Sequence, residues 1–301
     1  MRNEMIVIFI YSLDKTQFCT AASFQTMSKK VSPYFKTVGT VLGKKSPIKI
    51  QYSPENPPEG WRMMYDNILK MREDRTAPVD SMGCERSHDP AAPPAVQRFQ
   101  CLVSLMLSSQ TRDEVNYAAM MRLRRHGLTV ENVLNTDQKE LEKLIHPVGF
   151  WRNKAKYIKQ TCKILHEKYD NDIPDNVEEL CELPGVGPKM AYLTMNIAWQ
   201  KPTGIGVDTH VHRIVGRLGW TTPDTCKTAE QTRKSLEAWL PLDRWIEINW
   251  LLVGFGQQIC VPVGPKCGEC LNRNICPVGQ KWTPSPRKKS PKKRLKVDAD
   301  N

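Results

Sequence analysis

Residues 183–190 read Leu-Pro-Gly-Val-Gly-Pro-Lys-Met and lie between two apolar, helix-like stretches. Gly185 and Gly187 predict a tight turn, because glycine takes backbone conformations that are closed to other residues. Pro188 fits the first position of the helix that follows. The amides of Gly185, Val186 and Gly187 would then face a phosphate oxygen at the positive end of that helix. The stretch therefore predicts a helix, a turn and a helix that grip a DNA strand without reading its sequence, although a purely structural turn also fits the glycines.

Lys189 falls in the first turn of the second helix. The helix dipole disfavours a positive charge there, and partial burial adds to this effect, so the neutral amine is favoured. A neutral amine is a nucleophile that can form a Schiff base with a sugar carbon. The alternative is a lysine that contacts phosphate only as a point charge.

A second polar motif follows at residues 206–213, Gly-Val-Asp-Thr-His-Val-His-Arg, which opens a further helix. We place Asp208 at the N-cap of that helix, where a carboxylate accepts amide hydrogen bonds and stays ionised. If the carboxylate faces Lys189, it can also stabilise the positive charge that develops on a sugar as its base leaves. One residue can serve both roles.

Four cysteines lie within seventeen positions near the end of the chain, with six, two and five residues between them: Cys260, Cys267, Cys270 and Cys276. Four thiolates suit either tetrahedral zinc or an iron-sulfur cluster. The spacing differs from that of zinc ribbons and from the ferredoxin run, and we favour iron-sulfur. The other six cysteines show no comparable spacing, and we interpret them as small buried residues.

Helical periodicity dominates the rest of the chain. Ala155, Ile158, Cys162 and Leu165 share one helix face, and residues 102–107 are apolar nearly all round, as in a helix at the centre of a bundle. Strand-like alternation is scarce, so we predict an all-α fold. Among the helix ends, Asp175 with Glu178 predicts a capping box, and Gly127 predicts a helix stop.

The net charge of +12 resides in the two ends of the chain. Residues 1–50 hold eight Lys or Arg against two acids, residues 281–301 hold the same numbers, and residues 51–280 are therefore neutral. DNA binding by the central part must thus rest on local geometry. The run Pro-Lys-Lys-Arg-Leu-Lys at 291–296 is typical of a nuclear import signal, a phosphate contact or a solubilising tail. The basic leader fits a mitochondrial address or a plain disordered segment.

With these motifs identified, the chain resembles the endonuclease III family of DNA glycosylases with lyase activity, and most of all its eukaryotic, thymine-glycol type. The resemblance covers about residues 61–279. It also includes Leu-Ser-Ser-Gln-Thr-Arg-Asp at 107–113 and Pro-Val-Gly-Phe-Trp at 147–151. Five motifs in the expected order are much more specific than any one of them.

The resemblance implies a two-lobed helix-hairpin-helix glycosylase fold with DNA held between the lobes. It implies a six-helix domain at 91–203 that carries the hairpin, and an iron-sulfur lobe assembled from 59–90 and 204–280. A disordered leader and linker would occupy 1–58, and a disordered basic tail 281–301.

By resemblance, Lys189 is the Schiff-base lysine and Asp208 the catalytic aspartate. The four cysteines match the ligands of a largely structural [4Fe-4S] cluster. Gln110 matches the residue that fills the gap left by an extruded base, and Phe150, beside Trp151, lies in the loop that wedges the opposite strand. The expected DNA contacts are completed by Gly185, Val186, Gly187 and His210.

The resemblance further implies a bifunctional enzyme of base excision repair. It would excise oxidised pyrimidines from duplex DNA and cleave the strand at the abasic site by β-elimination. We expect a monomer that acts in the nucleus, with the mitochondrion as a second destination, and no membrane association, since the apolar run at 6–11 is far shorter than the roughly 20 residues that cross a bilayer. The alternatives are a non-catalytic DNA-binding protein and a glycosylase that does not cut, like the related adenine glycosylases.

Overall fold

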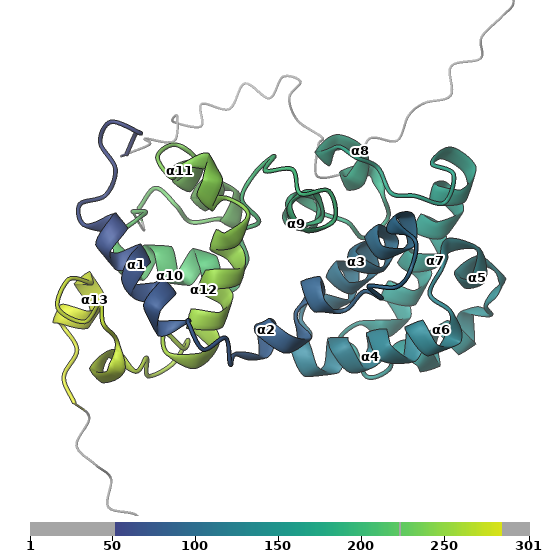
Figure 1. Ribbon diagram of the computed structural model, residues 1–301, viewed down its shortest axis with the longest axis horizontal. Helices are drawn as coiled ribbons and strands as arrows, with labels where there is room; N and C mark the ends of the chain where they lie inside the picture. Colours follow the sequence, from purple (N-terminus) through teal and green to yellow (C-terminus); the bar gives the residue numbers. More distant parts are fainter. Residues whose placement is uncertain (1–51, 223, 285–301) are drawn as a thin grey trace, which may run out of the picture. The chain divides into compact units, whose positions relative to one another are not determined.

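The computed structural model describes residues 52–222 and 224–284, and thirteen α-helices account for most of these residues (Figure 1). No strand occurs within these ranges, and a single isolated β-bridge joins Ser53 to Asn56. The predicted all-α fold is confirmed. The described part contains no helix long and apolar enough to cross a membrane.

Seven helices build the first hydrophobic core. They are α3 (Pro94–Ser108), α4 (Asp113–His126), α5 (Val130–Asn135), α6 (Gln138–Ile145), α7 (Trp151–Lys168), α8 (Val177–Glu182) and α9 (Pro188–Ala198). Every residue of α3 from Phe99 to Leu107 is buried, which confirms that this helix is central. In α7 the predicted face of Ala155, Ile158, Cys162 and Leu165 is buried as well.

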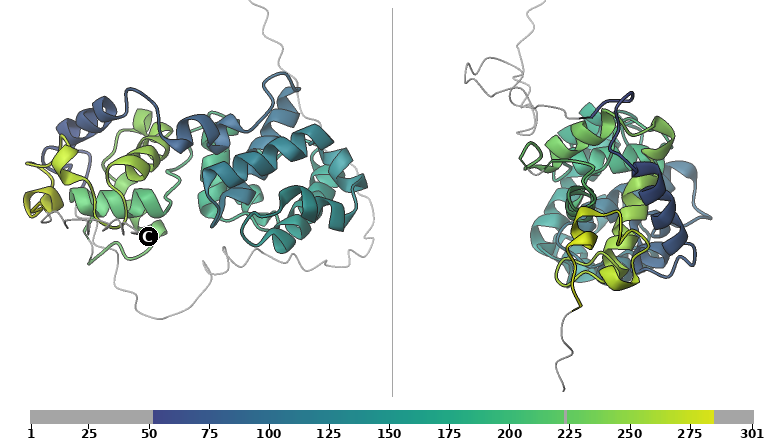
Figure 2. Two further views of the ribbon diagram at one scale, coloured as in Figure 1. Left: turned by 90° about the horizontal axis from the view of Figure 1, so that it is seen from below. Right: turned by 90° about the vertical axis from the view of Figure 1, so that its left-hand side faces the viewer.

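The second core combines segments from both ends of the described chain (Figures 1 and 2). It contains α1 (Trp61–Met71), α10 (Thr209–Leu218), α11 (Ala229–Glu237) and α12 (Glu247–Gln258), and the short helix α13 (Pro277–Gln280) packs against α10. Three tryptophan rings form two edge-to-face pairs in this core. The Trp239 ring centroid lies 5.3 Å from that of Trp61 and 5.7 Å from that of Trp220. This arrangement is the preferred one for aromatic pairs. The short helix α2 (Pro78–Met82) contacts both α4 and α12.

The helix count in the first core differs from the six that the resemblance implies. Between α4 and α7 the chain forms two short helices, α5 and α6. The backbone is extended at Thr136, and the Asp137 side chain then accepts a hydrogen bond from the Lys139 amide at 2.8 Å, which starts α6. A polar N-cap after an extended residue is sufficient to divide a helical segment.

Some residues assigned to the linker and tail are packed on the second core. The Tyr52 hydroxyl donates to the Gly219 carbonyl at 3.0 Å, and at the other end the Arg273 guanidinium lies 4.9 Å from the Trp282 ring centroid. Residues 1–51 and 285–301, which hold most of the predicted leader and the basic run, lie outside the described residues.

Candidate active site

The glycine turn has the predicted form. Helix α8 ends at Glu182, and α9 begins at Pro188 with proline in its first positions. Gly185 has a φ of +81°, and a side chain there would meet the Tyr157 ring at 2.9 Å. Only glycine satisfies both conditions, so the sequence of this turn is explained by its backbone.

Unlike the two glycines beside it, Val186 uses its amide and its side chain within the protein. Its side chain is buried in the first core, and its amide donates to the Leu183 carbonyl at 3.1 Å. A contact between the turn and a phosphate would therefore come from the adjacent amides, among them that of Gly187, the N-cap residue of α9.

Lys189 and Asp208 line the same cavity, together with Gln110 and His210. The cavity measures about 960 Å³, at the upper end of the range for small-molecule and cofactor sites. Lys189 is half-buried in the first turn of α9, as predicted. The structure thus brings together residues that are far apart in the sequence and belong to different cores.

Asp208 is the N-cap of α10, which confirms its predicted structural role. Its Oδ1 accepts a hydrogen bond from the Val211 amide at 2.8 Å. The cap fixes the carboxylate at the positive end of a helix, where a negative charge is stabilised. A carboxylate held in this way keeps its position while charge changes nearby.

His210 stands on the same helix and is half-buried in the cavity wall. Burial lowers the pKa of His210 below its ordinary value, although the negative charge of Asp208 acts in the opposite direction. The Arg213 Nη2 lies 3.3 Å from the His210 Nδ1. Because arginine can only donate, Nδ1 accepts, and the imidazole keeps its proton on Nε2.

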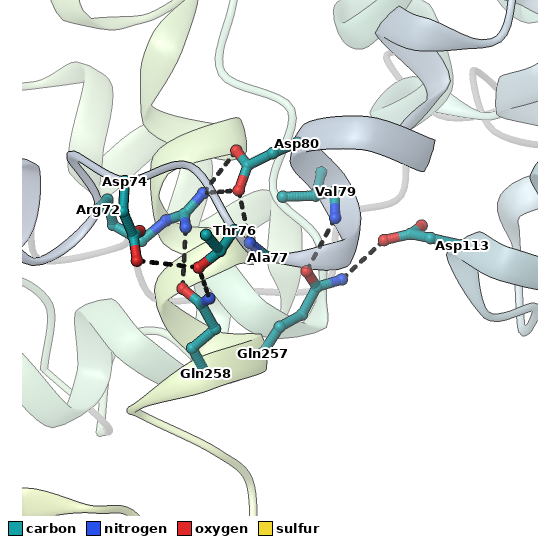
Figure 3. Close-up of polar contacts among 9 residues, drawn as sticks. All are labelled: Arg72, Asp74, Thr76, Ala77, Val79, Asp80, Asp113, Gln257 and Gln258. Carbon is teal, nitrogen blue, oxygen red and sulfur yellow. Dashed lines mark hydrogen bonds and ion pairs between the residues drawn. The ribbon is translucent and has the colours of Figure 1, made fainter.

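Asp113 and Gln257 also line the cavity, and sequence reasoning missed both. The Gln257 Nε2 donates to Asp113 Oδ2 at 2.7 Å, and its Oε1 accepts from the Val79 amide at 3.1 Å (Figure 3). Burial raises the pKa of Asp113. Gln257 connects α12 to α4 and α2, and no local sequence pattern predicts such a contact.

Gln110 and Phe150 occupy two exposed turns with the same unusual backbone. Gln110 has a φ of +51° and Phe150 a φ of +57°, in the left-handed region that residues other than glycine seldom adopt. Phe150 is 62% exposed, whereas its neighbour Trp151 packs against the first core. The structure therefore presents Phe150, and not Trp151, as the free aromatic side chain of this loop.

The four predicted cysteines line one small cavity in the second core. Apolar side chains, Arg217 and Arg273 complete the wall, and Arg217 Nη1 donates to Cys260 Sγ at 3.3 Å. All four thiols are free of disulfide bonds. In residues 52–222 and 224–284, no three His, Cys, Asp or Glu side chains are grouped closely enough to hold a metal ion. The donor set itself, four thiols around an apolar cavity, is the one that soft metals and iron-sulfur clusters require.

Comparisons with known sequences identify relatives of the chain. Residues 103–242 match the model of the HhH-GPD superfamily base excision DNA repair protein. Endonuclease III-like protein 1 of Gallus gallus is 58% identical over 234 residues, which cover 76% of this chain and 83% of that protein. The protein of the same name from Mus musculus is 57% identical over 234 residues, covering 78% of this chain and 77% of that one.

Solved structures show the same likeness. A structure described as a trapped endonuclease III–DNA covalent intermediate matches with a TM-score of 0.63 and 30% identity, over 73% of this chain and 96% of that one. A non-covalent endonuclease III–DNA complex matches with a TM-score of 0.62, also at 30% identity, over 73% of this chain and 95% of that one. From the extent and identity of these matches, the chain belongs to the endonuclease III family of base excision repair DNA glycosylases.

Proposed function

We propose that this enzyme excises oxidised pyrimidines from duplex DNA with Lys189 as the attacking amine, and then cleaves the strand at the resulting abasic site. The observation that carries the proposal is the shared cavity of Lys189, Asp208, Gln110 and His210. A nucleophile, a carboxylate and polar side chains around one cavity are what such a reaction needs. The relative described as a trapped covalent intermediate with DNA supports a covalent route.

The reaction has three stages: base release, ring opening and strand cleavage. The Lys189 Nζ bonds to the sugar C1′ as the bond from C1′ to the base breaks, and the departing base takes up a proton while the amine loses one. The sugar ring then opens at O4′, which is protonated, and leaves a Schiff base at C1′. Loss of a proton from C2′ breaks the bond between C3′ and its phosphate oxygen, and water finally hydrolyses the imine to return Lys189.

Asp208 stabilises the positive charge that develops on the sugar during these steps. As the base leaves, positive charge develops on the sugar, and a fixed carboxylate in the cavity stabilises that charge. The N-cap hydrogen bond from the Val211 amide holds Asp208 in place, so the side chain does not have to reorganise during the reaction. Stabilisation by preorganised groups is commonly the largest contribution to catalysis.

Access to the sugar requires that the damaged base leave the stack. The two exposed turns of the first core supply side chains that can take its place, Gln110 at the cavity wall and Phe150 on its exposed loop. Oxidised, non-planar pyrimidines stack poorly, and they are extruded at lower cost than intact bases.

Borohydride trapping tests this proposal. Wild-type protein is incubated with a duplex that contains thymine glycol, in the presence of sodium borohydride, which reduces the imine to a stable amine. We expect a covalent protein–DNA species on a denaturing gel, and no such species with an undamaged duplex of the same sequence. Binding without an adduct would contradict the proposal and support a non-catalytic DNA-binding role.

We also propose that Cys260, Cys267, Cys270 and Cys276 hold a [4Fe-4S] cluster. The thiols line one apolar cavity beside Arg217, whose positive charge suits an anionic cluster. When bound, the cluster would cross-link the segment between the end of α12 and the start of α13, which is a structural contribution. The cysteines are its ligands in this proposal, and no step of the base excision reaction passes through it.

Replacement of one ligand tests the cluster. We expect wild-type protein to be brown, with broad visible absorbance, and Cys267→Ser to lose that absorbance together with most of the bound iron and acid-labile sulfide. Cys226→Ser is the matched control, because Cys226 is buried but lies outside the cavity of the four cysteines, and this variant keeps its colour. Colourless wild-type protein with stoichiometric zinc would overturn the assignment.

A further inference from the structure

Lys154 is a buried lysine that the reaction outlined above leaves without a role. It lies in the first turns of α7 and is only 6% exposed. Its ammonium donates to the Leu107 carbonyl at 2.8 Å, the Ser109 carbonyl at 2.6 Å and the Thr111 hydroxyl at 3.3 Å. These acceptors belong to the end of α3 and to the turn that follows it.

The protonated form of Lys154 matches the three hydrogen-bond acceptors around it. Burial lowers the pKa of Lys154 to about 8, so the ammonium is still the major form at neutral pH. It then has three N–H donors for three acceptors. A cation against the last carbonyls of a helix is also stabilised by the helix dipole. Lys154 therefore terminates α3 from outside that helix.

Thr111 connects this arrangement to the second exposed turn. Its hydroxyl accepts from the Gly149 amide at 3.1 Å and donates to the Ser109 carbonyl at 3.1 Å. The two turns are also in close contact, because a side chain at Gly149 would lie 2.5 Å from the Gln110 carbonyl oxygen. The turn that contains Gln110 and the loop that contains Phe150 are thus tied through one hydroxyl.

The Lys154 side chain is linked to the Gln110 turn directly and to Phe150 through Thr111. Gln110 lies between Ser109 and Thr111, which both accept from the Lys154 ammonium, and Phe150 follows Gly149, whose amide donates to the Thr111 hydroxyl. Each has a left-handed backbone, which is unfavourable for residues other than glycine and persists only where the surrounding contacts impose it. The hydrogen bonds of the Lys154 ammonium and the Thr111 hydroxyl contact the backbone on both sides of Gln110 and directly before Phe150.

We propose that Lys154 is a positioning residue that fixes the Gln110 turn relative to the Phe150 loop, so that both side chains enter the DNA duplex together when a base is extruded. The inference rests on the proposed function, since it deepens the account of base extrusion. It assigns Lys154 no contact with DNA or with the reacting atoms.

A lysine that only stabilised the fold would affect all substrates alike. A positioning role predicts that activity falls on duplex DNA but not on a single-stranded oligonucleotide with an abasic site, because the single strand has no stacked base to replace. The lyase reaction on that oligonucleotide needs Lys189 and Asp208, whereas the Gln110 and Phe150 side chains have no stacked base to replace there.

Lys154→Met tests the proposal, since methionine fills similar space without a donor. We expect kcat/KM on a duplex with thymine glycol to fall roughly ten- to hundredfold, as for a small misplacement of positioning groups. The fluorescence rise of a 2-aminopurine placed beside the lesion, which reports loss of stacking, should shrink in parallel. Lyase activity on the single-stranded abasic oligonucleotide should stay within about twofold of wild type, because the reacting groups are unmoved.

Lys159→Met is the matched control. Lys159 lies on the same helix, and its ammonium likewise donates to backbone carbonyls, those of Leu134 and Thr136, but it contacts neither exposed turn. This variant should lose stability, and any loss of activity should be equal on the duplex and on the single-stranded oligonucleotide. Should Lys154→Met fail to fold, Thr111→Val removes the connection between the two turns and should give the same difference between the two substrates.

Equal losses on the duplex and on the single strand, or an unchanged 2-aminopurine signal, would overturn the inference. Those results are distinct from failure of the proposed function, in which wild-type protein would form no borohydride adduct with either substrate.

Discussion

Lys189→Gln is expected to abolish the borohydride adduct and to lower kcat for base excision by more than about 10³-fold. The substitution removes the only atom that the proposal places in a covalent bond with the sugar. Glutamine is nearly as long as lysine and forms helices about as well, so the first turn of α9 should be retained. Single-turnover excision on the thymine-glycol duplex, measured with excess enzyme, gives the rate of the chemical step.

A DNA-binding measurement shows whether Lys189→Gln loses the chemical step or the ability to bind damaged DNA. A duplex that carries a reduced abasic analogue cannot form an imine, so its affinity for Lys189→Gln, followed by fluorescence anisotropy, should stay within about tenfold of wild type. Lys201→Gln removes a positive charge that is exposed and paired with Asp175, and it should leave the adduct unchanged. An adduct in the Lys189→Gln reaction would place the attacking amine elsewhere.

The features that sequence analysis could predict depend on short stretches of chain. The turn at Gly185, the start of α9 at Pro188 and the N-cap at Asp208 follow from the conformations that these residue types allow. The buried faces of α3 and α7 follow from periodicity. Each depends on neighbours within a few positions, and such information is fully present in the sequence.

One local prediction was wrong by a single residue. Asp175 and Glu178 fit a capping box, but the N-cap of α8 is Asn176, whose side chain accepts from the Glu179 amide at 2.9 Å. Aspartate and asparagine are nearly equal as caps, so two adjacent candidates cannot be ranked by type alone. Asp175 pairs with Lys201 at 2.9 Å instead, and that contact depends on the tertiary fold.

The contacts between distant segments could not be predicted. Lys154 was missed even though it lies beside Ala155 on the apolar face of α7, where a lysine is out of place and could have been flagged. The bond between Gln257 and Asp113 joins positions 144 residues apart. Such pairs are set by packing geometry, and their residue types look like ordinary surface residues in the sequence.

The contacts of the buried side chain of Arg72 could not be predicted from the sequence either. Its side chain is 1% exposed, and its Nη2 lies 2.7 Å from both Asp80 oxygens (Figure 3). Gln258 Oε1 accepts from its Nη1 at 2.9 Å, and the guanidinium lies 5.4 Å from the Trp250 ring centroid. The arginine thus connects the segment after α1 to α2 and α12.

Asp80→Asn is therefore expected to lower the free energy of unfolding by about 3–5 kcal/mol, because it leaves a buried arginine without its counter-charge. Urea denaturation followed by far-UV circular dichroism measures the change. Glu140→Gln disrupts an exposed pair with Lys143, where the side chains are 44% and 75% exposed, and this control should cost less than about 1 kcal/mol. Equal losses in the two variants would mean that water reaches Arg72 and compensates its charge, contrary to the burial on which the prediction depends.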